Sequence, residues 1–209
     1  AEDLPFFVSF MEHLANAGMP CPRPVRDASG QALQTLQEKP ALIVSFLEGV
    51  PHRRPTAMHC AALGSFLAEI HLAGKGFAQT RDNTMGIAHW PALIAALPES
   101  AESLMPGYRA FLEAEIACLQ DRWPAGLPQG VIHADVFPDN VFFLNDSISG
   151  LIDLYFACND YWAYELAIAL NAWCFERDGS FNATKARAML RHYHQKRPLS
   201  LQEQQALPV

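Results

Sequence analysis

The chain has 209 residues, half of them hydrophobic and with 13 Phe, which is enough apolar material for a folded core and excludes a disordered chain. Its 15 Lys and Arg against 22 Asp and Glu give a net charge of −7. We therefore expect no nucleic-acid partner, because such proteins need a basic surface. An anionic substrate would require a local cationic pocket or a metal ion.

The cysteines and the apolar segments indicate a cytoplasmic protein with no membrane partner. Five Cys are widely spaced and form no C-x-x-C pair, which is typical of free thiols in a reducing compartment. The most apolar run, 163–175, is too short for a membrane span and contains Glu165 and Asn171. We also expect no signal peptide, because the first residues lack its pattern.

The first part of the chain predicts one helix and two strands. We expect a helix at 3–17, an extended Pro-rich stretch at 20–24, a turn at 27–30, and strands at 32–36 and 40–46. Asp3 is a suitable N-cap for the helix, and Gly18 is a suitable stop. The second strand contains a continuous apolar run at 41–44, so we expect it to be buried.

After residue 55 the pattern becomes mainly helical. We expect helices at 56–74, around 108–119, at 162–175 and at 182–196, strands at 131–132, 140–144 and 149–154, and a loop that contains Gly86, Trp90 and Pro91. Thr56 and Asn182 are suitable N-caps. The helix at 162–175 is apolar nearly all round, which predicts a central buried position. The change in composition at 48–55 predicts a boundary between two lobes.

One segment carries a spacing that is typical of phosphoryl transfer. His133, Asp135 and Asn140 follow the pattern H-x-D-x-x-x-x-N, and Asp153 comes thirteen residues after the Asn. Transfer from ATP needs a carboxylate that receives the acceptor's proton and oxygen ligands that hold magnesium. A loop and a following hairpin strand can bring these side chains into one cleft. A surface turn is the alternative, but it does not explain the apolar runs on both sides.

The segment resembles the catalytic and metal motifs of the aminoglycoside phosphotransferase and choline kinase-like superfamily, which is itself similar to protein kinases. Longer runs resemble its homoserine kinase branch, and the likeness covers nearly the whole chain. These runs are residues 4–7, 11–14, 21–25, 46–49, 130–144, 152–158, 170–176 and 179–187. The resemblance implies an α/β (α+β) protein-kinase-like fold, with a partial N-terminal nucleotide-binding lobe at 1–47 and a mostly helical catalytic lobe at 48–209.

The resemblance also implies a role for each matching residue. Asp135 resembles the catalytic base, His133 a structural member of its loop, and Asn140 and Asp153 the magnesium ligands. We expect the oxygens of the last two to share one magnesium ion in the cleft that contains Asp135.

Further positions resemble the supporting and nucleotide-binding parts of the family. Asp160 and Glu165 match residues that support the catalytic loop, although Glu165 stands where Asp is usual and has a longer arm. The hinge whose backbone reads adenine corresponds to Ser45, Phe46, Leu47 and Glu48.

The acceptor site is less constrained by the sequence. Arg81 and Asn83 lie in a loop where they can meet the carboxylate of an amino acid, and a solvated loop is an equal alternative. Tyr155 and Phe156 either line the acceptor pocket or pack in the core. The resemblance implies ATP- and Mg-dependent phosphorylation of the side-chain hydroxyl of L-homoserine, a step toward threonine.

Two other functions remain open from the sequence. One is the same chemistry on choline, an aminoglycoside or methylthioribose. The other is a non-catalytic nucleotide-binding or interaction module. The sequence indicates no oligomeric state.

The family resemblance implies parts that this sequence does not contain. A Gly-rich phosphate-covering loop and a strand Lys would come before residue 3, and further helices would follow residue 209. Glu12 is the candidate in the first helix for an ion pair with that Lys. We therefore expect the chain to be a fragment that has no ATP turnover by itself.

Overall fold

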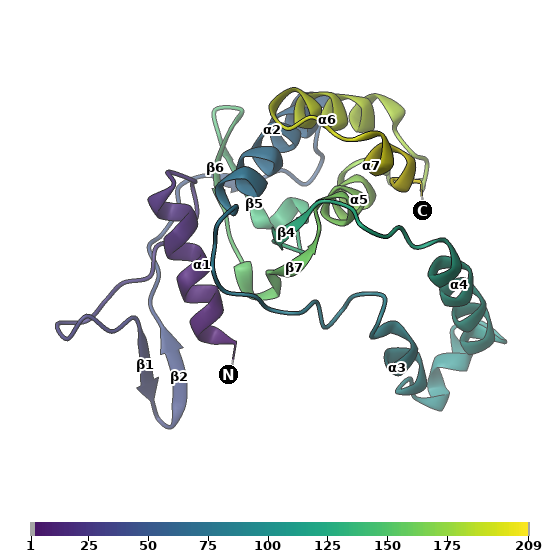
Figure 1. Cartoon of the computed structure of the whole chain (residues 1–209), viewed down its shortest axis with the longest axis horizontal. Coiled ribbons are helices and arrows are strands. Elements are labelled where there is room, and N and C mark those ends of the chain that lie inside the picture. Colours follow the sequence, from purple (N-terminus) through teal and green to yellow (C-terminus); the bar gives the residue numbers. More distant parts are fainter. Residues whose placement is uncertain (1–2, 209) are drawn as a thin grey trace.

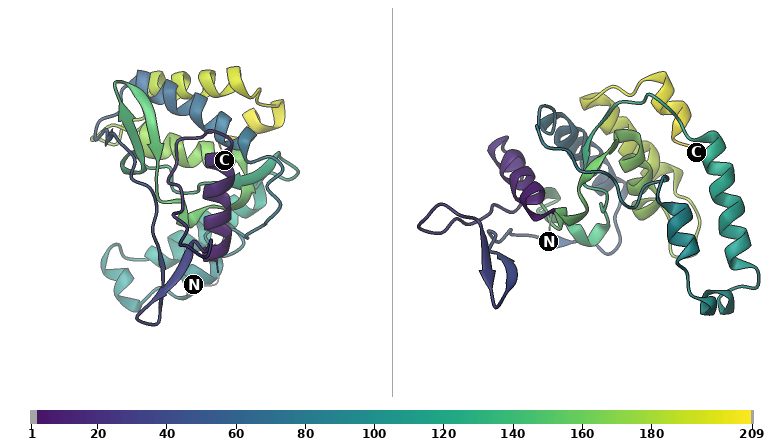
Figure 2. Two further views of the ribbon diagram at one scale, coloured as in Figure 1. Left: turned by 90° about the vertical axis from the view of Figure 1, so that its left-hand side faces the viewer. Right: turned by 60° about the horizontal axis from the view of Figure 1, so that its bottom comes forward.

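The computed structural model describes residues 3–208 (Figures 1 and 2). The helices are α1 (Leu4–Asn16), α2 (Ala57–Ala73), α3 (Trp90–Ala95), α4 (Tyr108–Arg122), α5 (Trp162–Trp173), α6 (Ala183–Lys196) and α7 (Leu201–Ala206). The strands are β1 (Leu33–Leu36), β2 (Lys39–Leu42), β3 (Val50–Pro51), β4 (Gln129–Ile132), β5 (Val141–Leu144), β6 (Ser147–Leu151) and β7 (Cys158–Tyr161). Short 3₁₀ helices lie at Glu99–Ser103, Pro138–Asn140 and Leu154–Phe156. Within residues 3–208, every helix is too short or too polar to cross a membrane.

The elements form a central helical body with a smaller part on each side (Figure 1). Helix α1 and the β1–β2 hairpin lie on one side, and α3 and α4 project on the other, as Figure 2 also shows. The strands pair antiparallel in three small sheets: β1–β2, β3–β5–β6 and β4–β7. The mixture of helices and small sheets confirms the expected α+β class.

The first helix is confirmed, with one change at its start. Phe6, Phe10 and Leu14 are buried along its apolar face, and Gly18 has the positive φ of +82° that ends the helix. Asp3 occupies the N-cap position, but its side chain makes no cap hydrogen bond. It instead accepts a hydrogen bond from Nε of Arg81 at 2.8 Å, and so joins α1 to a distant loop.

The expectation that the second strand is buried is wrong. Strand β2 ends at Leu42, and Ile43 and Phe46 are 69% and 88% exposed. A continuous apolar run implies burial only where layers cover both faces of a sheet. Among the described residues, β1 is the one strand that pairs with β2, so Leu33 and Leu42 are only half-buried against the core and Leu36 stays exposed.

The helical caps are confirmed. The hydroxyl of Thr56 accepts the amide of His59 at 3.4 Å, and the side chain of Asn182 accepts the amides of Thr184 and Lys185, both at 3.1 Å. These bonds satisfy amides that have no partner inside the helix. They fix the starts of α2 and α6, which pack along each other in Figure 1.

Helices α2 and α6 approach so closely that a glycine is required between them. A methyl group at Gly64 would collide with the backbone carbonyl of Met189. Helix α5 lies beside this pair and buries Leu166, Ala169 and Trp173 completely or nearly so. Its expected central buried position is therefore confirmed.

Two helices were not expected. Residues 90–95 form α3, although Pro91 suggested a loop; proline is tolerated in the first turn of a helix. Helix α7 follows a capping box made by Ser200 and Glu203. Helix α4 lies where the pattern placed it, but none of its residues is buried. The arm formed by α3 and α4 is therefore only loosely attached to the core.

The division into lobes at residues 47 and 48 stays a prediction. One hydrophobic cluster contains Phe10 from α1, Leu63 from α2 and Trp173 from α5. The core therefore continues across the expected boundary.

Candidate active site

The predicted catalytic residues lie in the loop 133–140, which connects β4 to β5. Two residues of the predicted site region have left-handed backbones although they are not glycine: Ala134 within the loop, with φ +64°, and Asp153, with φ +63°. Such a backbone costs about 1–3 kcal/mol and persists only when neighbouring contacts hold it. Unusual backbone geometry thus occurs just before Asp135 and at the predicted metal ligand.

His133 fixes the loop against the end of β6. Its ring is buried, and Nδ1 accepts the amide of Asp135 at 3.2 Å. Because Nδ1 accepts, the proton of the neutral ring is on Nε2, which donates to the carbonyl of Ile152 at 2.8 Å. This side chain therefore connects the predicted base to the residue that precedes Asp153.

Asn140 bonds the predicted base and keeps its own oxygen free. Its Nδ2 donates to the backbone carbonyl and to Oδ2 of Asp135, at 2.8 and 2.9 Å. For Oδ1 there is no donor within residues 3–208. The amide of Ile152 donates to the carbonyl of Asn140 at 2.9 Å. Because the exposed Asp153 directly follows Ile152, this bond holds the backbone of Asp153 close to that of Asn140. An amide oxygen and a carboxylate are ligands that magnesium prefers, so the residues present fit such an ion.

The surroundings raise the pKa of Asp135. Burial raises it most, and the nearby negative charges of Asp153 and Asp139 also raise it. His133 and the hydrogen bond from Asn140 oppose this effect. A raised pKa makes the carboxylate a better proton acceptor, which suits a general base.

Two separate cavities are lined by predicted site residues. The first, of about 180 Å³, is lined by Asp135 together with Arg81, Asn83, Phe156 and Tyr164. The second, of about 290 Å³, is lined by residues 44–47, which include three of the four predicted hinge residues, and by Met11, Asp153, Leu154 and Tyr155. The predicted base therefore faces one cavity and the predicted metal ligand Asp153 faces the other.

The structure places two of the three predicted acceptor residues beside Asp135. Nε and Nη1 of Arg81 donate to Asp3 and to the carbonyl of Ala157, and Nη2 has no acceptor within the described part of the chain. The amide of Asn83 donates to Asp160 at 2.7 Å. Tyr155 instead lines the cavity of the hinge.

The hinge residues differ in how many free backbone groups they offer. The amide of Ser45 donates to the carbonyl of Arg23 at 2.8 Å, and the carbonyl of Glu48 accepts the hydroxyl of Ser149 at 2.6 Å. Within residues 3–208, no protein partner takes the backbone groups of Phe46 and Leu47.

The two predicted supporting carboxylates make different contacts. Oε1 of Glu165 accepts the amides of His133 and Ala134, at 2.6 and 2.8 Å. The carboxylate of Asp160 accepts hydrogen bonds from Asn83 and from the amide of Tyr161, and in the described residues it makes none to the loop. The direct contact to the loop thus comes from Glu165, whose longer arm reaches both amides.

Burial and neighbouring groups act in opposite directions on Glu165. Full burial raises the pKa of a carboxyl group, but the hydrogen bond from His71 and the loop amides outweigh it, so the pKa of Glu165 lies below its ordinary value. His71, which is fully buried, was missed in the sequence. The sequence did contain a signal for His71: it is a polar residue on the side of α2 that otherwise carries buried apolar residues such as Leu67.

A model of the phosphotransferase enzyme family matches residues 1–199. The chain therefore belongs to the phosphotransferase enzyme family. Among solved structures, an aminoglycoside-3′-phosphotransferase of type VIII has a TM-score of 0.70 at 22% identity, over 99% of this chain and 78% of its own. An amicoumacin kinase has a TM-score of 0.73 at 13% identity, over 96% and 64%. These similarities confirm the expected fold.

The resemblance to homoserine kinases is also confirmed. The homoserine kinase of Rhodopseudomonas palustris (strain TIE-1) is 54% identical over 209 residues, which are 100% of this chain and 64% of the relative. That of Xanthobacter autotrophicus is 54% identical over 207 residues, which are 99% and 64%. The chain thus spans about 64% of the length of these curated relatives.

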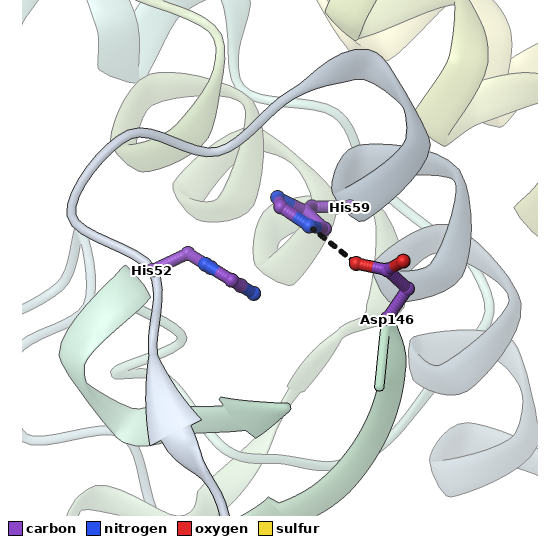
Figure 3. Close-up of side chains that lie close together, drawn as sticks. All are labelled: His52, His59 and Asp146. Atoms are coloured by element: carbon purple, nitrogen blue, oxygen red, sulfur yellow. Dashed lines mark ion pairs between the residues drawn. The ribbon is translucent and has the colours of Figure 1, made fainter. Parts of the chain in front are cut away.

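A separate cluster joins His52, His59 and Asp146, whose ligand atoms lie within 4.8 Å of one another (Figure 3). The two rings stack with centroids 3.9 Å apart. However, Nδ1 of His59 accepts the amide of Thr56, so its proton is on Nε2, the atom nearest Asp146. A metal at Nε2 would move the proton of the neutral ring to Nδ1. Nδ1 could then no longer accept the amide of Thr56, and this bond of the capping box would be lost. The contacts in hand explain the cluster without a metal.

The same cluster predicts a pH effect on stability. Burial and the charge of His52 lower the pKa of His59, against the effect of Asp146. A histidine with a lowered pKa gives up its proton on folding, so the fold loses stability as the pH falls below the ordinary histidine pKa. His59→Gln keeps a capping-box acceptor but does not titrate. The melting temperature of this variant minus that of wild type should therefore rise as the pH falls from about 8 to about 5.

Thermal unfolding at several pH values measures this difference. His89→Gln removes an exposed histidine and serves as the matched control. A His59→Gln variant whose melting temperature stays parallel to that of wild type would contradict the assignment.

Proposed function

We propose that the full-length protein transfers the γ-phosphate of ATP to the side-chain hydroxyl of L-homoserine. The observation that carries the proposal is the half-buried Asp135, which lines a small cavity and accepts a hydrogen bond from the side chain of Asn140. The 54% identity to homoserine kinases supports this choice of acceptor.

Asp135 is proposed as the base. The acceptor oxygen would attack the γ-phosphorus while its proton passes to the Asp135 carboxylate, and the bond to the bridging oxygen would break to release ADP. Because this transition state is loose, positioning contributes as much as proton removal. The hydrogen bond from Asn140 fixes Oδ2 of Asp135, which leaves Oδ1 to orient the hydroxyl.

Asn140 and Asp153 are proposed to hold magnesium. The free Oδ1 of Asn140 and the exposed carboxylate of Asp153 support this role. When bound, magnesium neutralises charge on the phosphate oxygens. The hydrogen bonds of His133 and Ile152 keep the two ligands on neighbouring backbone segments.

The cavity at the hinge is proposed to take the adenine. Its lining is mostly apolar, and the free backbone groups of Phe46 and Leu47 can bond the base edge. Asp153 lines the same cavity, so a nucleotide seated there would extend its phosphates toward the magnesium ligands.

The acceptor is proposed to occupy the cavity beside Asp135. A volume of about 180 Å³ suits a molecule of few atoms, and Nη2 of Arg81 can meet a carboxylate. Phe156 and Tyr164 close the other sides. These features favour a small amino acid over an aminoglycoside.

Replacing the base should remove turnover and keep nucleotide binding. In the full-length protein, Asp135→Asn should lower kcat by about 10²–10⁴-fold, because the amide cannot take the proton. ATP affinity should change little, since the hinge cavity is not altered. Steady-state kinetics and nucleotide titration measure the two effects. Near-wild-type turnover would exclude Asp135 as the base.

A substrate screen tests the acceptor separately. Homoserine, choline, methylthioribose and kanamycin would be compared by kcat/KM with saturating ATP and magnesium. Homoserine should be preferred by roughly 10⁴-fold or more, because a site built for buried polar groups rejects ligands that lack them. If choline or kanamycin is the better substrate, phosphoryl transfer stands and the acceptor assignment fails.

Arg81 should affect the acceptor and not ATP. Arg81→Lys removes the planar fork, so the KM for homoserine should rise about tenfold or more while the KM for ATP stays constant. Asp3→Asn is the matched control, because it breaks the same ion pair and leaves the guanidinium in place. Equal effects of both variants on homoserine KM would show that Arg81 acts only through its pairing with Asp3.

A further inference from the structure

Helix α1 contacts residues that line both cavities of the candidate site. At its start, the carboxylate of Asp3 accepts Nε of Arg81, which lines the cavity beside Asp135. Two turns further along, Met11 lines the cavity at the hinge. Phe7 lies between Asp3 and Met11 in the sequence and is buried, and its ring contacts one lining residue of each cavity. One aromatic side chain therefore connects the two cavities.

The ring of Phe7 supports the guanidinium of Arg81. The Cζ atom of Arg81 lies over this ring, 5.0 Å from its centroid. An aromatic face attracts a cation at this distance, and more strongly where water is excluded; the side chain of Arg81 is only 16% exposed. Asp3 and the carbonyl of Ala157 accept Nε and Nη1 of the same group. Three contacts thus hold the guanidinium whose Nη2 is proposed to meet the acceptor.

The same ring meets Tyr155, which lines the cavity at the hinge. The centroids of the two rings are 5.7 Å apart and their planes are at 85°, an edge-to-face arrangement. Tyr155 is 42% exposed, so its side chain keeps rotamer freedom that a ligand can restrict. A nucleotide in the cavity at the hinge would contact Tyr155, and Phe7 would carry this restriction to Arg81.

We infer that Phe7 is a positioning residue for Arg81, and that its contact with Tyr155 makes the affinity for the acceptor depend on the nucleotide. The inference rests on the proposed roles of the two cavities. When only a fraction of the molecules hold Arg81 in the competent position, the apparent affinity for the acceptor is reduced by that fraction. The nucleotide raises the fraction, and the coupling between the two binding events is reciprocal.

Core packing is the alternative role for Phe7, and Phe10 provides the matched control. Phe10 lies on the same helix and is 1% exposed, against 5% for Phe7, and its ring packs on those of Phe6 and Phe77. A change to Leu at either position removes a buried ring, so both variants should have a lower melting temperature. The change at Phe7 also removes the aromatic face from the guanidinium of Arg81. Core packing alone predicts the same kinetics for the two variants.

Steady-state kinetics of the full-length protein separate the two roles. Phe7→Leu should raise the KM for homoserine about fivefold or more, because Arg81 loses the attraction of the ring, and kcat and the KM for ATP should change little. Phe10→Leu should keep the wild-type KM for homoserine. A wild-type KM in Phe7→Leu, or an equal rise in Phe10→Leu, would overturn the inference.

Fluorinated phenylalanines at position 7 separate the charge of the ring face from the volume of the ring. Fluorine withdraws electron density from the face with little change in shape, so the attraction for a cation weakens while the core stays filled. The KM for homoserine should rise stepwise from one to three fluorine atoms, by up to about tenfold. A KM that does not change along this series would show that Phe7 acts through its volume alone, against the inference.

Calorimetry tests the coupling between the cavities. A saturating non-hydrolysable ATP analogue with magnesium should strengthen the binding of homoserine about fivefold or more in the wild-type protein and in Phe10→Leu. In Phe7→Leu, this factor should fall toward one. The same affinity for homoserine with and without the analogue in the wild-type protein would contradict the coupling.

A readout at Arg81 itself does not depend on the acceptor. In NMR spectra, the proton on Nε of Arg81, assigned with Arg81→Lys, should be shifted upfield by the ring current of Phe7. This shift should disappear in Phe7→Leu, persist in Phe10→Leu, and increase when the ATP analogue is added to wild type. These results are expected even if homoserine is not the substrate, so failure of the proposed function is distinct from failure of the inference. An Arg81 signal that is the same in both Leu variants would overturn the inference.

Discussion

The buried carboxylate of Glu165 joins the loop 133–140 to the helical core. Its Oε1 binds two consecutive amides of this loop, and its Oε2 binds His71 on a different helix. A charge in this position costs several kcal/mol unless hydrogen bonds replace the lost water. Because three donors do so, the group stays ionised and the left-handed Ala134 is retained. This side chain thus supports the backbone directly before Asp135, and His133 and Asn140 bond Asp135 itself.

The predicted site residues line two cavities of different character. The cavity at the hinge is mainly apolar and includes the exposed Asp153 in its lining. The smaller cavity brings Arg81 and aromatic side chains to Asp135. Although the chain is acidic overall, it presents the cation Arg81 where we expect an anionic group of a substrate. It presents the carboxylate of Asp153 where we expect a divalent ion. Net charge alone indicates neither position.

Local patterns were sufficient for most of the elements and for the motif. The caps at Thr56 and Asn182 and the loop of Asp135 depend on residues near in sequence, so spacing and side-chain chemistry predict them. Burial of the strand at 40–46 was predicted wrongly because it depends on layers that the strand itself does not encode. Helix α3 was missed because Pro91 is compatible with both a loop and a first turn.

The supports of the site depend on contacts that no local pattern contains. The bond between His71 and Glu165 joins residues 94 positions apart. His71 was therefore not singled out, and Glu165 was identified only through resemblance. In the same way, the sequence could not show which hinge residues have free backbone groups. Phe46 and Leu47 were distinguished only because the structure shows hydrogen-bond partners for the backbone of Ser45 and Glu48.

The hydrogen bond between His71 and Tyr193 spans 122 residues, and this length has a consequence for how the protein is made. Closing a loop of that length is entropically unfavourable until many other contacts have formed, so the bond belongs to the late stage of folding. During synthesis, α2 leaves the ribosome long before α6 does. The order of the chain therefore delays the bond between His71 and Tyr193 until α6 has been made and has docked on α2.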